Sequence, residues 1–220
     1  MVDDDDCILY NIQDKFPNLT NIKLYITDYS QGYNQNCARS LEIKENPECK
    51  INKFSLDTPF NSHIKFYIQS FETLVSVSFN FCMRFSMEKD YFPIFNDKCK
   101  VIFKSLKYFQ FIQDSYTLDF SVIKNLYQNM DYMPNLKYFE LKCYQKDINE
   151  EFINNFIKKI LSIDLDIVKL ALTKDEFFLR ELGYNKYKEY SINELKEIYP
   201  NVNINKYKIL SIIKNNDDYD

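Results

Sequence analysis

The chain has 220 residues, of which 45% are apolar and 27% charged, and its formal net charge is −4. This composition supports a buried core and excludes a disordered or fibrous chain. With only two glycines, no glycine-rich phosphate-binding loop occurs. The lysines are scattered rather than gathered in a basic stripe, which disfavours a nucleic-acid partner. No apolar run approaches the roughly 20 residues of a membrane-spanning helix, so we expect no membrane partner.

The six cysteines and the single histidine, His63, predict neither a metal site nor a cofactor. No two cysteines have the C-x-x-C spacing that zinc sites use, and one histidine cannot supply the other ligands. The first thirty residues lack the apolar segment of a secretory signal peptide. We therefore expect a cytoplasmic protein whose thiols are reduced and mostly buried.

In chain order, apolar triplets with the spacing L-x-x-L-x-L predict a series of short strands. They begin at residues 19, 51, 74, 106, 136, 167 and 199, so five of the six intervals span 30 to 32 residues and one spans 23. The sixth triplet is Ile167, Leu170 and Leu172, and the seventh is Tyr199, Val202 and Ile204. Units of this length cannot bury their own apolar face, so they must stack on their neighbours.

Helical periodicity fills the intervals between the triplets. We expect a minimal helix from Ser62 to Ser70 and a helix with Val122, Ile123 and Leu126 inward. Capping boxes then predict helix starts at Asp147 and at Ser191. The last of these helices should turn Ile192, Leu195 and Ile198 inward. Strands joined by helical crossovers of this length run parallel, so the predicted class is α/β.

Three of the triplets overlap the similar phrases "FPNL", "MPNL" and "YPNV", at 16–19, 133–136 and 199–202. Proline disfavours a helical conformation at the residue before it. The phrase therefore predicts the joint at which a helix stops and the chain enters the next strand.

The phrases "MPNLKYFEL" and "FPNLTNIKL" resemble the PNL-x-x-L-x-L phrase of the leucine-rich repeat family. The unit length and the helix "INEEFINNFIKKIL" resemble its ribonuclease-inhibitor-like and F-box-associated classes. The resemblance covers nearly the whole chain and implies a single leucine-rich repeat solenoid of about seven irregular units over residues 1–210, with a polar tail at 211–220. In such a solenoid a curved parallel sheet forms the concave face and helices form the convex face. The Asn or Cys that the family places three residues after the last strand Leu is matched only by Cys82, which predicts irregular loops.

Side chains alternate along a strand, so the residues between the buried positions predict the concave surface. Tyr108 and Tyr138 fall in one column of this surface, beside Lys107 and Lys137. Aromatic residues beside cations are typical of protein-binding hot spots, whereas the alternative reading is an ordinary solvated sheet face. The candidate binding residues are Lys23, Tyr25, Lys53, Ser55, Ser76, Ser78, Lys107, Tyr108, Gln110, Lys137, Tyr138, Glu140 and Lys169.

The resemblance implies a protein-interaction module without catalytic activity that binds a protein partner through the concave face. One alternative is the substrate-recognition arm of a ubiquitin-ligase complex, in which a larger multi-subunit assembly supplies the missing adaptor. A second alternative is a GTPase-activating regulator that uses Arg84, the residue that follows the third strand closely. The substitution Arg84→Ala in a GTP-hydrolysis assay separates that alternative from a binding module.

Overall fold

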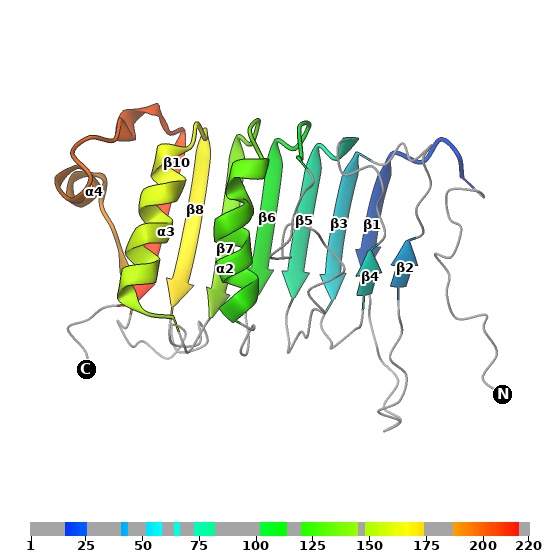
Figure 1. The fold of residues 1–220 in the computed structure, drawn as a ribbon, viewed down its shortest axis with the longest axis horizontal. Coiled ribbons are helices and arrows are strands. Elements are labelled where there is room, and N and C mark those ends of the chain that lie inside the picture. Colours follow the sequence, from blue (N-terminus) through cyan, green and yellow to red (C-terminus); the bar gives the residue numbers. More distant parts are fainter. Residues whose placement is uncertain are drawn as a thin grey trace, which may run out of the picture.

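The computed structural model describes residues 16–25, 41–43, 52–58, 64–66, 73–81, 102–113, 120–144, 148–173 and 187–215. These residues form one large sheet, with helices lying against one of its sides (Figure 1). The order of the strands in space follows the order of the chain, apart from the last two.

In the described part, the sheet has eight strands in the order β1-β3-β5-β6-β7-β8-β10-β9. Seven of them run parallel, and the short β9 joins β10 antiparallel at one edge. The predicted α/β class with a parallel sheet is therefore confirmed. The strands are β1 (Asn21–Tyr25), β3 (Lys53–Thr58), β5 (Ser76–Phe81), β6 (Tyr108–Gln113), β7 (Tyr138–Tyr144), β8 (Ile167–Thr173), β9 (Tyr187–Glu189) and β10 (Ile209–Asn215).

Two further strands, β2 (Leu41–Ile43) and β4 (Ile64–Phe66), form a separate parallel pair. The predicted helix from Ser62 to Ser70 is wrong at 64–66, and its other residues lie outside the described ranges. Ile64 and Phe66 favour a strand by their residue types, and β2 supplies a partner 23 residues earlier in the chain. A local periodicity argument does not detect such a pairing.

Helix α2 (Phe120–Asn129) lies over β6 and β7, and helix α3 (Glu150–Ser162) lies over β8 and β10 (Figure 1). The side chain of Asn149 caps α3 by accepting a hydrogen bond from the backbone N–H of Phe152 at 2.8 Å. The prediction of Asp147 as the start of this helix is therefore wrong by two residues. Asn is as good an N-cap as Asp, so sequence alone does not choose between them.

The capping box of the last helix, α4 (Ile192–Ile198), is confirmed. Ser191 Oγ accepts from the backbone N–H of Glu194, and the Glu194 carboxylate accepts from the backbone N–H of Ser191. Its predicted inward face is only partly right: Leu195 is fully buried, but Ile192 and Ile198 are 53% and 50% exposed. A helix of two turns that packs on one neighbour has room to bury a single side chain of this set.

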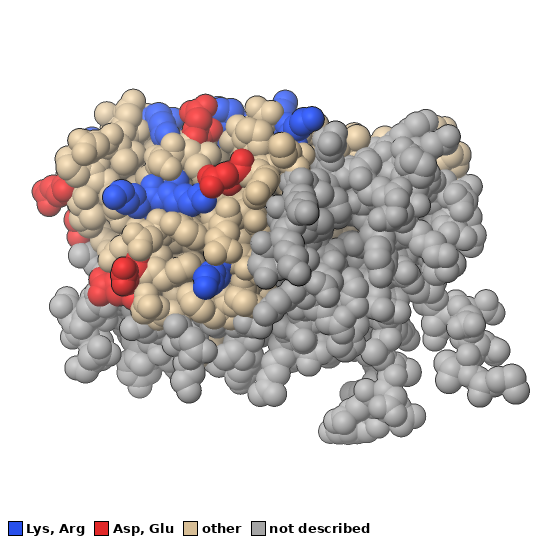
Figure 2. Space-filling view, viewed as in Figure 1, with Lys and Arg blue, Asp and Glu red and all other residues tan. Residues whose placement is uncertain are grey.

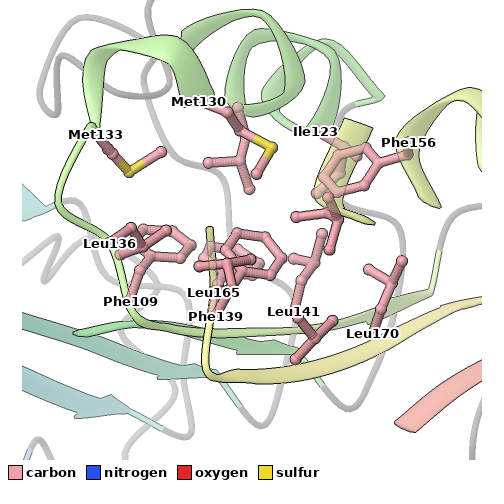
Figure 3. Packing of buried hydrophobic residues seen from close by; sticks show 14 of the residues in the cluster. Phe109, Ile123, Met130, Met133, Leu136, Phe139, Leu141, Phe156, Leu165 and Leu170 are labelled. Carbon is pink, nitrogen blue, oxygen red and sulfur yellow. The ribbon is translucent and has the colours of Figure 1, made fainter. Parts of the chain in front are cut away.

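The core lies between the sheet and the helices. Phe109, Phe139 and Leu141 point from the strands toward Ile123 of α2 and Phe156 of α3 (Figure 3). The rings of Phe109 and Phe139 stack at 5.6 Å between centroids, and Phe139 lies 6.3 Å from Phe156. The large apolar residues of the triplets therefore supply the buried side of the sheet, as the spacing predicted.

The strand register corrects the sixth triplet. Phe139 pairs with Val168, and Leu141 pairs with Leu170, so the buried series is Leu165, Val168 and Leu170. The predicted series began two residues later, at Ile167, which lies on the opposite side of the sheet. A triplet that begins at Leu165 and one that begins at Ile167 both fit the spacing L-x-x-L-x-L, so the sequence alone does not choose between these two registers.

The seventh triplet, Tyr199, Val202 and Ile204, does not form a strand. These residues follow α4 and lead into a 3₁₀ turn, Ile204–Lys206. The register pairs Val168 with Leu210 and Leu170 with Ile212 in β10, so the last strand starts ten residues after the predicted triplet. The final unit is longer than the others because it contains β9 and α4.

The Pro-Asn phrases form the same turn in all three places. Leu19, Leu136 and Val202 each donate a backbone hydrogen bond to the carbonyl three residues earlier, at 3.0 to 3.2 Å. Proline at the second position of such a turn has its preferred backbone angle. The first two turns lead into β1 and β7, as predicted, whereas the third leads into the 3₁₀ turn. Asn135 also donates its side-chain amide to the carbonyl of Lys104 at 2.7 Å, which ties two successive units together.

A candidate binding face on the sheet

The side of the sheet turned away from α2 and α3 carries alternate strand residues that are half-buried or exposed. We call this side the polar face. The register aligns its side chains into rows that cross the strands. The tyrosine row contains Ser76, Tyr108, Tyr138, Ile167 and Ile209, and the glutamate row contains Ser78, Gln110, Glu140, Lys169 and Ser211.

The structure brings most of the predicted binding residues onto this face. Lys23 and Lys53 are exposed, and Ser55 is half-buried, on the strands nearest the chain start. Ser76, Ser78, Tyr108, Gln110, Tyr138, Glu140 and Lys169 follow on the next strands. For Tyr25, only the backbone in β1 belongs to the described part.

The two tyrosines of the tyrosine row stack on each other. Their ring centroids lie 4.1 Å apart, with 15° between the ring planes. This geometry arises because Tyr108 and Tyr138 pair directly across β6 and β7, where opposite side chains on one face come close. The predicted tyrosine column is therefore a single, ordered aromatic surface.

Glu140 holds the stack in place from the glutamate row. The Tyr138 hydroxyl donates a hydrogen bond to the Glu140 carboxylate, and the Gln110 amide donates to the same oxygen at 2.8 Å. Ser78 Oγ donates in turn to Gln110 Oε1 at 2.5 Å. The Glu140 side chain is only 16% exposed, so its acceptor capacity is used largely within the protein.

Lys169 completes the cluster on the adjacent strand. Its Nζ lies 3.9 Å from Glu140 Oε2 and 5.7 Å from the centre of the Tyr138 ring. Both contacts are attractive for a cation. The Lys169 side chain is 42% exposed, so it still presents its ammonium group to solvent beside the aromatic stack.

The tyrosine hydroxyls stay protonated at neutral pH. Burial raises the pKa of Tyr138 far above its usual range, and the hydrogen bond to Glu140 raises it further. Burial also raises the pKa of Tyr108, partly offset by its hydrogen bond with Tyr138. At neutral pH, Tyr138 is therefore a hydrogen-bond donor to Glu140.

The sequence predicts Lys107 and Lys137 as the cations that flank the two tyrosines. In the structure, the ammonium group of Lys137 instead pairs with Asp164. Its Nζ bonds to Asp164 Oδ2 at 2.5 Å, at the edge of the sheet where the strands begin. This ion pair raises the pKa of Lys137 and lowers that of Asp164. Lys107 is exposed at the same edge. The cation next to the stack is Lys169, on a neighbouring strand.

Sequence reasoning missed two residues of the tyrosine row, Ile167 and Ile209. The predicted sixth triplet began at Ile167 and so assigned this residue to the core. The seventh strand was predicted at 199–204, so Ile209 was not assigned to any strand. Ile209 is 47% exposed, which is unusual for a strand residue of its size. The sequence feature that could have identified both isoleucines is the alternation in "IVKLALT" and "ILSIIKN". When these two strands are aligned, Ile167 and Ile209 are their first residues and lie opposite each other.

The helix side of the molecule has a different character. Figure 2 shows basic and acidic side chains interspersed over it, with uncharged surface between them. An open pocket of about 410 Å³ lies between α3 and α4, lined by residues that include Asn154, Lys158, Tyr190 and Ile198. Its lining mixes charges of both signs and holds no cluster of buried polar groups.

Several residues singled out in the sequence lie outside the described ranges, including Arg84 and His63. Among the cysteines, the structure describes Cys143, which is fully buried, and burial raises the pKa of its thiol. Within the described residues, no group of three or more His, Cys, Asp or Glu side chains is placed to hold a metal ion. No helix in this part of the chain has the length and hydropathy to cross a membrane.

Comparison with protein families, with curated proteins and with solved structures gives no match for this chain.

Proposed function

We propose that the chain is a leucine-rich-repeat-like solenoid that acts as a non-catalytic protein-interaction module and binds a protein partner through the polar face. The observation that carries the proposal is the Tyr108–Tyr138 stack, fixed by Glu140 and flanked by Lys169. Aromatic side chains that are ordered before binding lose little conformational entropy on binding, which favours their use as anchors.

A repeated backbone pattern supports the solenoid part of the proposal. At five of the six steps between neighbouring parallel strands, a carbonyl at the start of one strand accepts hydrogen bonds from two successive N–H groups at the start of the next. The carbonyls of Thr20, Asn52, Val75, Lys107 and Lys137 do so, at 2.7 to 3.2 Å. Parallel strands in chain order, with α2 and α3 on the same side, fit stacked units that each contact only their neighbours.

The experiment is an affinity pull-down from the source cell with the 220-residue chain as bait. The double variant Tyr108→Ala, Tyr138→Ala should lose a partner that the wild type retains, because truncating a hot-spot aromatic costs about 2 kcal/mol or more of binding free energy. The matched control is Lys124→Ala, an exposed residue of α2 on the helix side. Circular dichroism checks that all three proteins fold alike.

Retention of every partner by the double variant would contradict the proposal and move the binding site off the polar face. Loss of the same partner in the Lys124→Ala control would show that the loss is not specific to the tyrosines.

A further inference from the structure

The part of the tyrosine row that crosses β6, β7, β8 and β10 consists of large, mainly apolar side chains. Across β6, β7, β8 and β10 the row reads Tyr108, Tyr138, Ile167 and Ile209, four large side chains in direct register. None of these four is fully buried, and Ile209 is 47% exposed. On β5, by contrast, the row has only Ser76. We call these four residues the apolar stripe.

Polar and charged groups border the apolar stripe on both sides. At the strand starts, Lys137 pairs with Asp164, and Lys208 pairs with Asp166 at 2.9 Å, so these charges are already balanced. On the other side lies the glutamate row, where Lys169 is 42% exposed and Glu140 only 16%. An apolar centre with a polar rim is the usual anatomy of a protein interface.

The spacing of the stripe indicates the shape of its partner. Neighbouring strands lie about 4.8 Å apart, so a segment crossing the strands meets one stripe residue every 4.8 Å. An α-helix advances about 5.4 Å per turn, which nearly matches this spacing. An extended chain repeats its side chains on one face about every 6.7 Å and loses register after the second strand.

We propose that the apolar stripe binds one amphipathic α-helix of a partner protein, lying across β6 to β10 with apolar residues at i, i+3 or i+4, and i+7. The helix carries an acidic residue on the flank that faces Lys169, because Lys169 is the more exposed member of its pair with Glu140. Three strand spacings cover about 14 Å, which about three helical turns span. The inference rests on the function proposed above and names the partner's chemistry.

The test is selection from a displayed library of random 18-residue peptides against the full chain, followed by fluorescence anisotropy with the enriched peptides. The expected peptides have apolar residues spaced three and four apart, carry Asp or Glu on one flank and become helical on binding. Ile209→Ser should weaken them about tenfold, because it removes apolar surface that is 47% exposed in the free chain and covered in the complex. The matched control Ile192→Ser, at an isoleucine 53% exposed on α4, should leave the affinity unchanged.

Lys169→Gln tests the acidic flank separately. It should weaken acidic peptides several-fold and leave variants of the same peptides with glutamine in place of the acidic residue unaffected. Lys124→Gln on α2 is its control.

The outcomes separate this inference from the proposed function. Peptides that depend on Tyr138 but alternate apolar residues with period two, or that ignore Ile209→Ser, overturn the helix and leave the polar face as a binding surface. Enrichment of basic flanks overturns the charge assignment. Selection that yields no peptide sensitive to either Tyr138→Ala or Ile209→Ser overturns the helix proposal, and the pull-down with the tyrosine variants then decides the proposed function alone.

Discussion

Strands β1, β3 and β5 and strands β6, β7, β8 and β10 share a buried side but differ on the polar face. On β1, β3 and β5 the described side chains of this face are polar or charged, as with Lys53, Ser55 and Ser76. On β6 to β10 the same rows carry the stacked tyrosines, a hydrogen-bonded Glu140 and two isoleucines. The buried side carries large apolar residues on every one of these strands, so packing of the core does not account for the difference on the polar face, where we propose binding.

The largest expected effect concerns the buried side of the sheet, which both groups of strands share. Phe139→Ala should lower the free energy of unfolding by about 3–5 kcal/mol, because Phe139 is fully buried against Phe109 and Phe156. Phe54→Ala, at a ring that is 2% exposed on β3, should cost a similar amount. Urea denaturation measures both. A much smaller loss for Phe54 would mean that the two regions do not share one core.

Alkaline pH should destabilise the later strands and the turn that follows α4. Burial raises the pKa of Tyr207 to about 12, and burial also raises the pKa values of Tyr108 and Tyr138. A tyrosine whose pKa is higher in the folded state stabilises the fold fully below its unfolded value, about 10. That stability is lost as the pH rises from about 10 toward 12.

Thermal unfolding between pH 8 and pH 12 measures this effect. Tyr207→Phe removes one of the titrating groups, so its melting temperature should fall less steeply above pH 10 than that of the wild type. An equal slope in both proteins would show that Tyr207 does not titrate in the way its burial implies.

The glutamate row should contribute stability on β6 and β7 but not on β3. Gln110→Ala should cost about 1–2 kcal/mol, because Gln110 donates to the half-buried Glu140 and accepts from Ser78. Ser55→Ala, in the same row on β3, should change stability by less than about 0.5 kcal/mol. Equal costs in urea denaturation would remove the distinction between the two regions at this row.

The smallest effect concerns α4, which lies within the last crossover, between β8 and β10. Ser191→Ala should cost about 1 kcal/mol or less by removing the capping box with Glu194. Ser191→Asp keeps an acceptor at the same place and should retain most of the stability. Differential scanning calorimetry distinguishes the two, and an equal loss for both would show that the cap hydrogen bond is not the cause.

The sequence predicted the parallel sheet, the positions of its first five strands (β1, β3, β5, β6 and β7) and the tyrosine column because each depends on a local pattern. The period of the triplets marks the strands, and alternation decides which side a residue faces. Successive triplets of the same spacing predict the register between neighbouring strands, so the sequence alone places Tyr108 and Tyr138 together.

The same reasoning failed where two local patterns were equally good or where the partner was distant. Leu165 and Ile167 fit the triplet equally well, and only pairing with β7 decides between them. The phrase "YPNV" forms the expected turn, yet the chain goes on into a 3₁₀ turn, in which Lys206 and Tyr207 donate hydrogen bonds to carbonyls at the end of α3. These are tertiary contacts, which a local sequence pattern does not indicate. The last strand therefore begins ten residues after the predicted triplet, and the pattern did not assign Ile209 to the polar face.

The central claim is that binding belongs to the later strands of the polar face. The most direct measurement compares two double variants as baits, with quantitative mass spectrometry of the proteins that each one captures. Tyr138→Ala with Ile209→Ala alters the later strands, whereas Lys53→Ala with Ser55→Ala alters the same rows on β3. We expect the first variant to bind a partner about tenfold or more weakly and the second to retain it. Loss with the β3 variant and retention with the other would contradict the claim.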